Sequence, residues 1–259
     1  MAVFAFDIET VPDVELGRRM YGLDGLSDKQ VGYVMQTRRR EETGSEFLSL
    51  EQHRIVAISV ALRTRDAFKV WSLGDPEAPE SELIQRFFDG IDKYTPDLVS
   101  WNGCGFDLPV LHYRALRHGI VAARYWETGD EDQAFRWNNY LNRYHWRHLD
   151  LMDVLSGYQA RGRASLQNVA TLLGLPGKLG MSGEKVWEAW LDGRIVDIRR
   201  YCETDVLNTF LVYLRFESMR GHLGPAQYAA EVELVRDVLA AQGQPHCEEF
   251  LAAWPRISG

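Results

Sequence analysis

The stretch MAVFAFDIET (residues 1–10) decides the fold, because it joins an apolar run to two closely spaced acids. The run predicts a buried central strand, with Asp7 and Glu9 at its far end. Side chains two residues apart in a strand point the same way, so the two carboxylates share one face. Such a pair repels itself and is costly to bury, which favours a hard divalent cation between oxygen ligands. Taken alone, the pair is explained more simply as solvated acids at a strand end.

Composition indicates a folded protein with a sizeable core. The chain has 259 residues, of which 46% are hydrophobic and 12% aromatic, as expected for one large α/β domain or a domain with appendages. No stretch approaches the ~20 apolar residues of a membrane span. The first apolar run has no cationic leader, so we expect no signal peptide and no membrane contact. The odd set Cys104, Cys202 and Cys247 has no metal-binding spacing and suggests reduced thiols in a cytoplasmic protein.

The net charge of −8 bears on the kind of partner. It argues against a protein coated in base for non-specific binding to duplex DNA. It leaves open an acidic, metal-loaded pocket whose basic rims hold a phosphodiester.

Hydrophobic periodicity predicts further elements after the first strand. In chain order these are a helical insertion with a loop (14–50), an antiparallel hairpin (54–64 and 67–73), a helix (81–94), a strand (97–101) and later helices (165–174, 183–193, 194–217 and 225–243). Residues 244–259 are expected to be a tail packed on the body. The resulting β-β-β-α-β order predicts that the acids of the first half meet at adjacent strand ends.

Two more acidic features lie further along the chain. Asp107 follows the flexible turn 102–105 and precedes Pro109, which fits the first turn of a helix. By itself it is explained as an acid favourable to the helix dipole. Tyr201 and Asp205 are four residues apart in a predicted helix, so they lie on one face. Each feature is ambiguous alone, and their combination with the acids of the first strand is specific.

Two surface patterns have open interpretations. The segment RWNNYLNRYHWRHLD (136–150) interleaves aromatic residues with arginines, as single-strand binding proteins do. A loop whose aromatics fill a groove in the core explains it equally well. Arg161, Arg163 and Lys178 suggest a phosphate-binding rim on charge alone.

Three motifs together resemble a known family. FDIET (6–10), WNGCGFD (101–107) and YCETD (201–205) look like the exonuclease motifs of the DEDD 3′–5′ exonuclease superfamily, in its tyrosine branch (DEDDy). The likeness is to stand-alone bacterial proteins related to the proofreading exonuclease domain of family B DNA polymerases. HLDLMDVLSG (148–157) and LPGKLGMSGEKVW (175–187) also look like that subgroup. Any one motif is weak, but the three in this order are a strong signal over about residues 1–215.

The resemblance implies a fold and a metal centre. The fold is the α/β, ribonuclease H-like one, a mixed central β-sheet flanked by helices, and the cofactor is a pair of Mg²⁺ or Mn²⁺ ions. By resemblance, Asp7, Glu9 and Asp205 ligate the ion that binds the attacking water. Asp7 also bridges to a second ion, which Asp107 holds largely through water. Tyr201 orients the attacking water by a hydrogen bond, since an unperturbed tyrosine is a poor base near neutral pH.

Three further residues match family positions that meet the terminal nucleotides of the substrate. Asn102 is expected to hydrogen-bond the strand, and Thr10 to meet its 3′ end through the backbone. Phe106 is expected to stack on a base or wedge between two, with core packing as an equal alternative.

The function so predicted is a metal-dependent 3′–5′ exonuclease that releases nucleoside 5′-monophosphates from single-stranded or frayed DNA. Alternatives are a 3′–5′ exoribonuclease and a non-catalytic nucleic-acid end-binding module, with DNA favoured over RNA.

The predicted domains are residues 1–215, the exonuclease, and 216–259, a C-terminal helical extension packed on the same domain. That extension is too short for a polymerase domain, so proofreading would act in trans. The helix of this extension could instead contact a second copy of the chain, in a homodimer, or a trans-acting partner.

Overall fold

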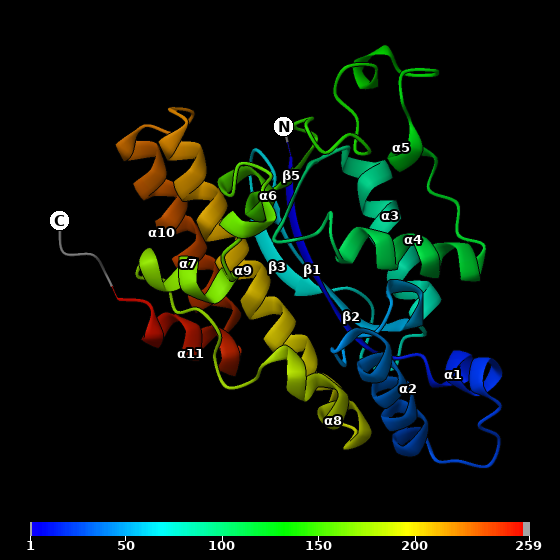
Figure 1. The fold of residues 1–259 in the computed structure, drawn as a ribbon. Helices are drawn as coiled ribbons and strands as arrows, with labels where there is room; N and C mark the ends of the chain where they lie inside the picture. The colour runs from blue at the N-terminus through cyan, green and yellow to red at the C-terminus, as the bar shows by residue number, and fades with distance from the viewer. Residues whose placement is uncertain (1, 256–259) are drawn as a thin grey trace.

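The computed structural model describes residues 2–255, which form a helix-flanked β-sheet (Figure 1). Five strands lie in the order β3-β2-β1-β4-β5. They are β1 (Val3–Pro12), β2 (His53–Arg63), β3 (Phe68–Ser72), β4 (Asp97–Ser100) and β5 (His148–Asp150). β1 is central, antiparallel to β2 and parallel to β4. This mixed sheet confirms the predicted α/β, ribonuclease H-like architecture.

One face of the sheet is covered by helices that follow the hairpin. They are α3 (Glu80–Tyr94), α4 (Asp107–His118) and α5 (Ala123–Trp126). The alternate residues Phe4, Phe6 and Ile8 of β1 point to this face and join its buried core. The next residues along β1, including Ala5, therefore point to the opposite face.

The opposite face is covered by the long helix α9 (Ile195–Met219), which packs against β1 and β2. Val206 and Phe210 of α9 share a buried cluster with Ala5. Around α9 lie α6 (Leu151–Leu155), α7 (Leu166–Leu172), α8 (Val186–Leu191), α10 (Pro225–Gln242) and α11 (Pro245–Ala253). α10 and α11 pack on α9, and α10 also reaches the sheet, where Gln242 donates to the Val70 carbonyl oxygen of β3.

The start of the chain differs from the sequence prediction in one respect. β1 does not stop at Glu9 but runs to Pro12, with a bulge between Glu9 and Thr10. The two acids therefore lie within the strand and not at its end, because β2 continues to pair with β1 beyond them. The predicted hairpin is confirmed by β2 and β3. The predicted helical insertion is confirmed by α1 (Val14–Tyr21) and α2 (Asp28–Thr43).

Several elements were not predicted, among them α5, α6, β5 and α11. β5 has only three residues, too few to display a period, yet it pairs in parallel with β4. Residues 245–253, expected as part of a tail, form α11.

Helix α9 continues through residue 215, and α10 and α11 pack on it. The division of the chain at residue 215 stays a prediction. Among residues 2–255, no helix combines the length and apolar character needed to cross a lipid bilayer.

Candidate active site

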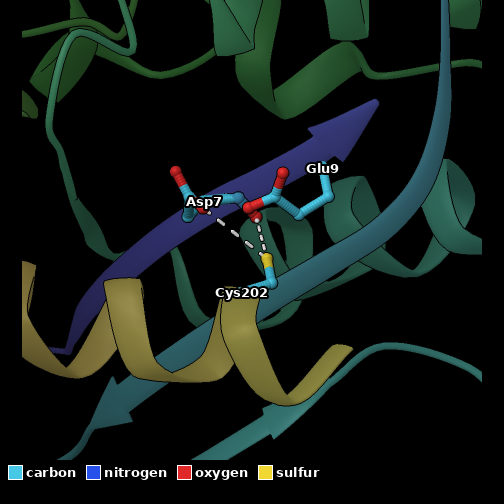
Figure 2. Close-up of side chains that lie close together, drawn as sticks. All are labelled: Asp7, Glu9 and Cys202. Atoms are coloured by element: carbon cyan, nitrogen blue, oxygen red, sulfur yellow. Dashed lines mark hydrogen bonds between the residues drawn. The ribbon is translucent and has the colours of Figure 1, made fainter. Parts of the chain in front are cut away.

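Asp7 and Glu9 point from the central strand toward α9. Their carboxyl groups lie side by side above Cys202 of that helix (Figure 2). The Cys202 thiol donates to the Asp7 carbonyl oxygen at 3.4 Å and lies 3.6 Å from Asp7 Oδ2. Glu9 is buried and Asp7 is only partly so. The pair is therefore enclosed between the sheet and α9.

Asp107 reaches the same region from the first turn of α4. β4 pairs with β1 only as far as Ala5, so the β1 backbone beyond that point lacks a strand partner on this side. There the Ile8 N–H donates to Asp107 Oδ1 at 3.2 Å. The side chain of Asp107 is buried and fixed against the strand that carries the other two acids.

Tyr201 and Asp205 face the acids from the middle of α9, and both are buried. Lys178, in the loop before α8, lies with its Nζ 3.8 Å from Asp205 Oδ2. The same Nζ is 5.5 Å from the centre of the Tyr201 ring. Lys178 is thus a cation at the border of the acidic cluster.

Burial raises the pKa of all four carboxyl groups, and at Asp7 and Glu9 the charges of neighbouring acids add to it. Burial has the largest effect on Asp7, and the charges of Asp107, Glu9 and Asp205 add to it, so the pKa of Asp7 rises well above its ordinary value. Burial and the charge of Asp205 likewise raise the pKa of Glu9. Burial raises the pKa of Asp107 to about 7 and that of Asp205 to about 6. A cation among the four acids would favour their charged forms.

The donor set fits a hard divalent ion. Among the described residues, Asp205 Oδ1 is buried without any hydrogen-bond partner, which leaves its lone pairs for a ligand. Carboxylate oxygens are the ligands that Mg²⁺ and Mn²⁺ prefer, and several of them converge here. Asp7, Glu9 and Cys202 offer ligand atoms within 4.8 Å of one another.

A pocket of about 640 Å³ adjoins the acids, and Glu9, Thr10 and Phe106 are among its lining residues. The Phe106 ring packs against the rings of two other residues that line the pocket. Its centroid lies 5.5 Å from that of Phe47 and 5.1 Å from that of His53. The Thr10 hydroxyl is hydrogen-bonded to the ring of His53. Phe106 is therefore packed against neighbours and also lines the pocket, and its role in stacking on a base stays a prediction.

Asn102 is not among the described residues that line this pocket. It occupies the left-handed region, at a φ of +67°, in the turn between β4 and α4. Its N–H donates to Asp150 Oδ1, and its carbonyl accepts from the N–H groups of Gly105 and Phe106. In this structure Asn102 shapes the turn that presents Phe106 and Asp107.

Sequence reasoning missed three members of this region. Cys202 was noted only as a thiol, although it precedes Asp205 by three residues and so shares its helix face. Phe47 and His53 come from the insertion and the start of β2. No local signal identifies them, because only the packing of α2 and its loop brings them to Phe106.

Comparison with known proteins gives one family match. A family model described as a predicted 3′–5′ exonuclease related to the exonuclease domain of PolB matches residues 45–254. The matched range contains Asp107, Tyr201 and Asp205 and begins after Asp7 and Glu9. No curated protein matches the chain significantly.

Proposed function

The chain belongs to the family of predicted 3′–5′ exonucleases related to the exonuclease domain of PolB, and from that premise we propose its substrate and mechanism. It is a metal-dependent enzyme that hydrolyses phosphodiester bonds from the 3′ end of single-stranded or frayed DNA and releases nucleoside 5′-monophosphates. The observation that carries this proposal is the convergence of four mutually repelling carboxyl groups beside an aromatic pocket.

The four acids form the cofactor site in this proposal. Asp7, Glu9 and Asp205 would hold one Mg²⁺ or Mn²⁺, and Asp107 would hold a second together with Asp7. Bound cations there supply a more acidic water and positive charge for the phosphate oxygens. The unpartnered Oδ1 of Asp205 and the raised pKa values of the cluster support this assignment.

Tyr201 positions the attacking water. Burial, followed by the charges of Asp205 and Glu9, raises the pKa of Tyr201 above its ordinary value. The phenol therefore keeps its proton at neutral pH and serves as a hydrogen-bond donor to the water oxygen, not as a base. Its place four residues before Asp205 holds the hydroxyl beside the acidic cluster.

The terminal nucleotide occupies the pocket beside Glu9. Phe106, supported by Phe47 and His53, offers a ring for base stacking. The backbone of Thr10 meets the 3′ end, and Asn102 acts on the strand through the turn that it shapes. A base must be unpaired to enter such a pocket, which favours single-stranded or frayed ends.

The direct test uses oligonucleotides labelled at the 5′ end, with a free or a chemically blocked 3′ end, in Mg²⁺ or Mn²⁺. We expect a ladder that shortens from the free 3′ end, no ladder from the blocked one, and nucleoside 5′-monophosphates as products. Cleavage rates on DNA and RNA strands of the same sequence show which nucleic acid the enzyme prefers. Faster cleavage of RNA would make RNA the proposed substrate. Tight 3′-end binding without cleavage in any metal would refute catalysis and favour an end-binding module.

A further inference from the structure

A group of rings and guanidinium groups lies on the surface near α6. We call it the ring patch and define it as Arg143, Tyr144, Tyr158 and Arg163. The two tyrosine rings meet edge to face, with centroids 4.8 Å apart, and Tyr144 is 64% exposed. The guanidinium carbon of Arg143 lies 5.4 Å from the Tyr158 ring centre. The patch combines an exposed tyrosine ring and a partly exposed one with positive charge.

The arginines of the ring patch are held from below by one acid. Arg143 and Arg163 both bond Asp153 of α6, whose side chain is 2% exposed. The arginine side chains themselves are 42% and 37% exposed. The neighbouring acid Asp150 is buried, and it accepts backbone N–H groups at the start of α6. The patch therefore shows guanidinium groups to solvent while its carboxylates lie beneath.

The backbone that presents Tyr158 is unusual. Gly157 and Tyr158 both adopt the left-handed region, at φ values of +60° and +61°. A bulky side chain rarely does so, because its Cβ crowds the backbone there. The Tyr158 N–H donates to the Asp153 carbonyl at 2.7 Å, which fixes the ring beside Arg143. Such strain is retained most often where a side chain serves binding or catalysis.

The ring patch adjoins the proposed active site through the turn before α4. Cys104 of that turn offers an atom within 4.8 Å of both Asp150 and Asp153. The Cys104 N–H also donates to Asp150 Oδ2 at 2.9 Å. Cys104 stands three residues before Asp107. The ring patch therefore lies next to the turn that leads to Asp107.

We propose that the ring patch binds the single-stranded segment on the 5′ side of the scissile bond, an inference that rests on the proposed function. Bases stack on Tyr144 and Tyr158, and phosphates pair with Arg143 and Arg163. Stacking is tolerant of sequence because every base has a π face, and guanidinium groups match phosphate oxygens. A duplex keeps its bases stacked on each other, so the patch selects single strands.

Two other members of the interleaved segment 136–150 do not share this role. Tyr140 is buried, with its hydroxyl bonded to the Pro96 carbonyl, and Arg147 packs over the Phe135 ring. These side chains belong to the core, as the second interpretation of the segment predicts. Only part of the segment is therefore assigned to the ring patch.

The test compares binding of a trinucleotide and a dodecanucleotide by fluorescence anisotropy, in EDTA so that no cleavage occurs. The variant is Tyr144→Ala with Tyr158→Asn, because asparagine tolerates the left-handed backbone. The control is Tyr94→Ala, a partly exposed tyrosine at the end of α3. We expect the double variant to bind the dodecanucleotide about tenfold more weakly than the wild type does, with little change for the trinucleotide. Thermal melting confirms that both proteins are folded.

Equal binding of the dodecanucleotide by the wild type and the folded double variant would overturn the proposal that the ring patch binds the strand. A wild type that does not prefer the longer strand would overturn it too. The proposed function is judged separately, by cleavage in Mg²⁺ or Mn²⁺, so the two failures are distinguishable. DNA and RNA strands are both tested, and a blunt duplex of the same length should bind more weakly than either single strand.

Discussion

Asp205 is the residue at which charge and stability conflict most directly. Its pKa is raised from 3.8 to about 6, mainly by burial. A carboxyl group with a higher pKa in the folded chain than in the unfolded chain binds protons on folding. The free energy of unfolding therefore falls as pH rises between these two values, and the loss is complete above pH 6. In the metal-free protein, the ionised cluster is a source of instability.

We therefore expect Asp205→Asn to raise the melting temperature of the metal-free protein relative to the wild type at neutral pH. The advantage should shrink as pH falls from about 6 toward 3.8, because the wild-type carboxyl group then takes up its proton. Scanning calorimetry in EDTA at several pH values measures this difference in melting temperature. Asp237→Asn, an exposed position on α10, is the control. A difference between variant and wild type that does not change with pH would refute this account of the cluster.

Tyr201 is expected to act through its hydroxyl alone. Tyr201→Phe keeps the ring and removes the donor, so kcat should fall by about a hundredfold, the usual effect of one lost hydrogen bond to reacting atoms. Metal binding, followed by calorimetric titration, should change little, because Tyr201 is not among the proposed ligands. Unchanged kcat would show that the hydroxyl does not touch the attacking water.

At the scale of elements, one buried cation joins α1, α3 and α4. Arg114 of α4 bonds Asp13, the N-cap of α1, and Glu80 at the start of α3. All three side chains are 5% exposed or less. Glu80 also accepts the Ile55 N–H of β2 at 2.7 Å. This network fixes α4, and with it Asp107, relative to the central strand.

Arg114→Ala removes the shared buried cation from Asp13 and Glu80, which then keep only the more exposed side chains of Arg117 and His118 as cationic neighbours. We expect it to lower the free energy of unfolding by about 3–5 kcal/mol. Arg86→Ala on α3 is the matched control, because its ion pair with Glu82 is exposed and contributes at most about 1 kcal/mol. Urea denaturation of both variants measures the difference. Equal, small effects would mean that the network does not stabilise the fold.

Local spacing was sufficient to predict the elements that bear the acids. Asp7 and Glu9 share a strand face, and Tyr201 and Asp205 share a helix face, because the 2.0 and 3.6 residue periods hold in the folded chain. The predicted end of β1 was wrong, because pairing with β2, and not the pattern of side chains, decides where that strand ends. α11 was missed although Gly243 and Pro245 mark its boundary with α10.

At the scale of the whole molecule, the sequence predicted the mixed sheet but not what surrounds the acids. Cys202 lies against Asp7 because α9 crosses β1 at that point. Phe47 meets Phe106 because the insertion after β1 folds back over the pocket. The ring patch unites residues from either side of β5 and α6. Such contacts depend on tertiary packing, which no periodicity within one segment encodes.

The central claim is that the four carboxyl groups are the centre at which a 3′-terminal phosphodiester is cut. Its most direct test is the initial rate of nucleotide release from a single strand as Mn²⁺ is titrated, for Asp7→Asn and Asp205→Asn beside the wild type and Asp237→Asn. We expect saturable release from the wild type and the control. Loss of a cation ligand should slow either site variant at least about a thousandfold. Wild-type rates in Asp7→Asn or Asp205→Asn, or no release by the wild type in any divalent metal, would contradict the claim.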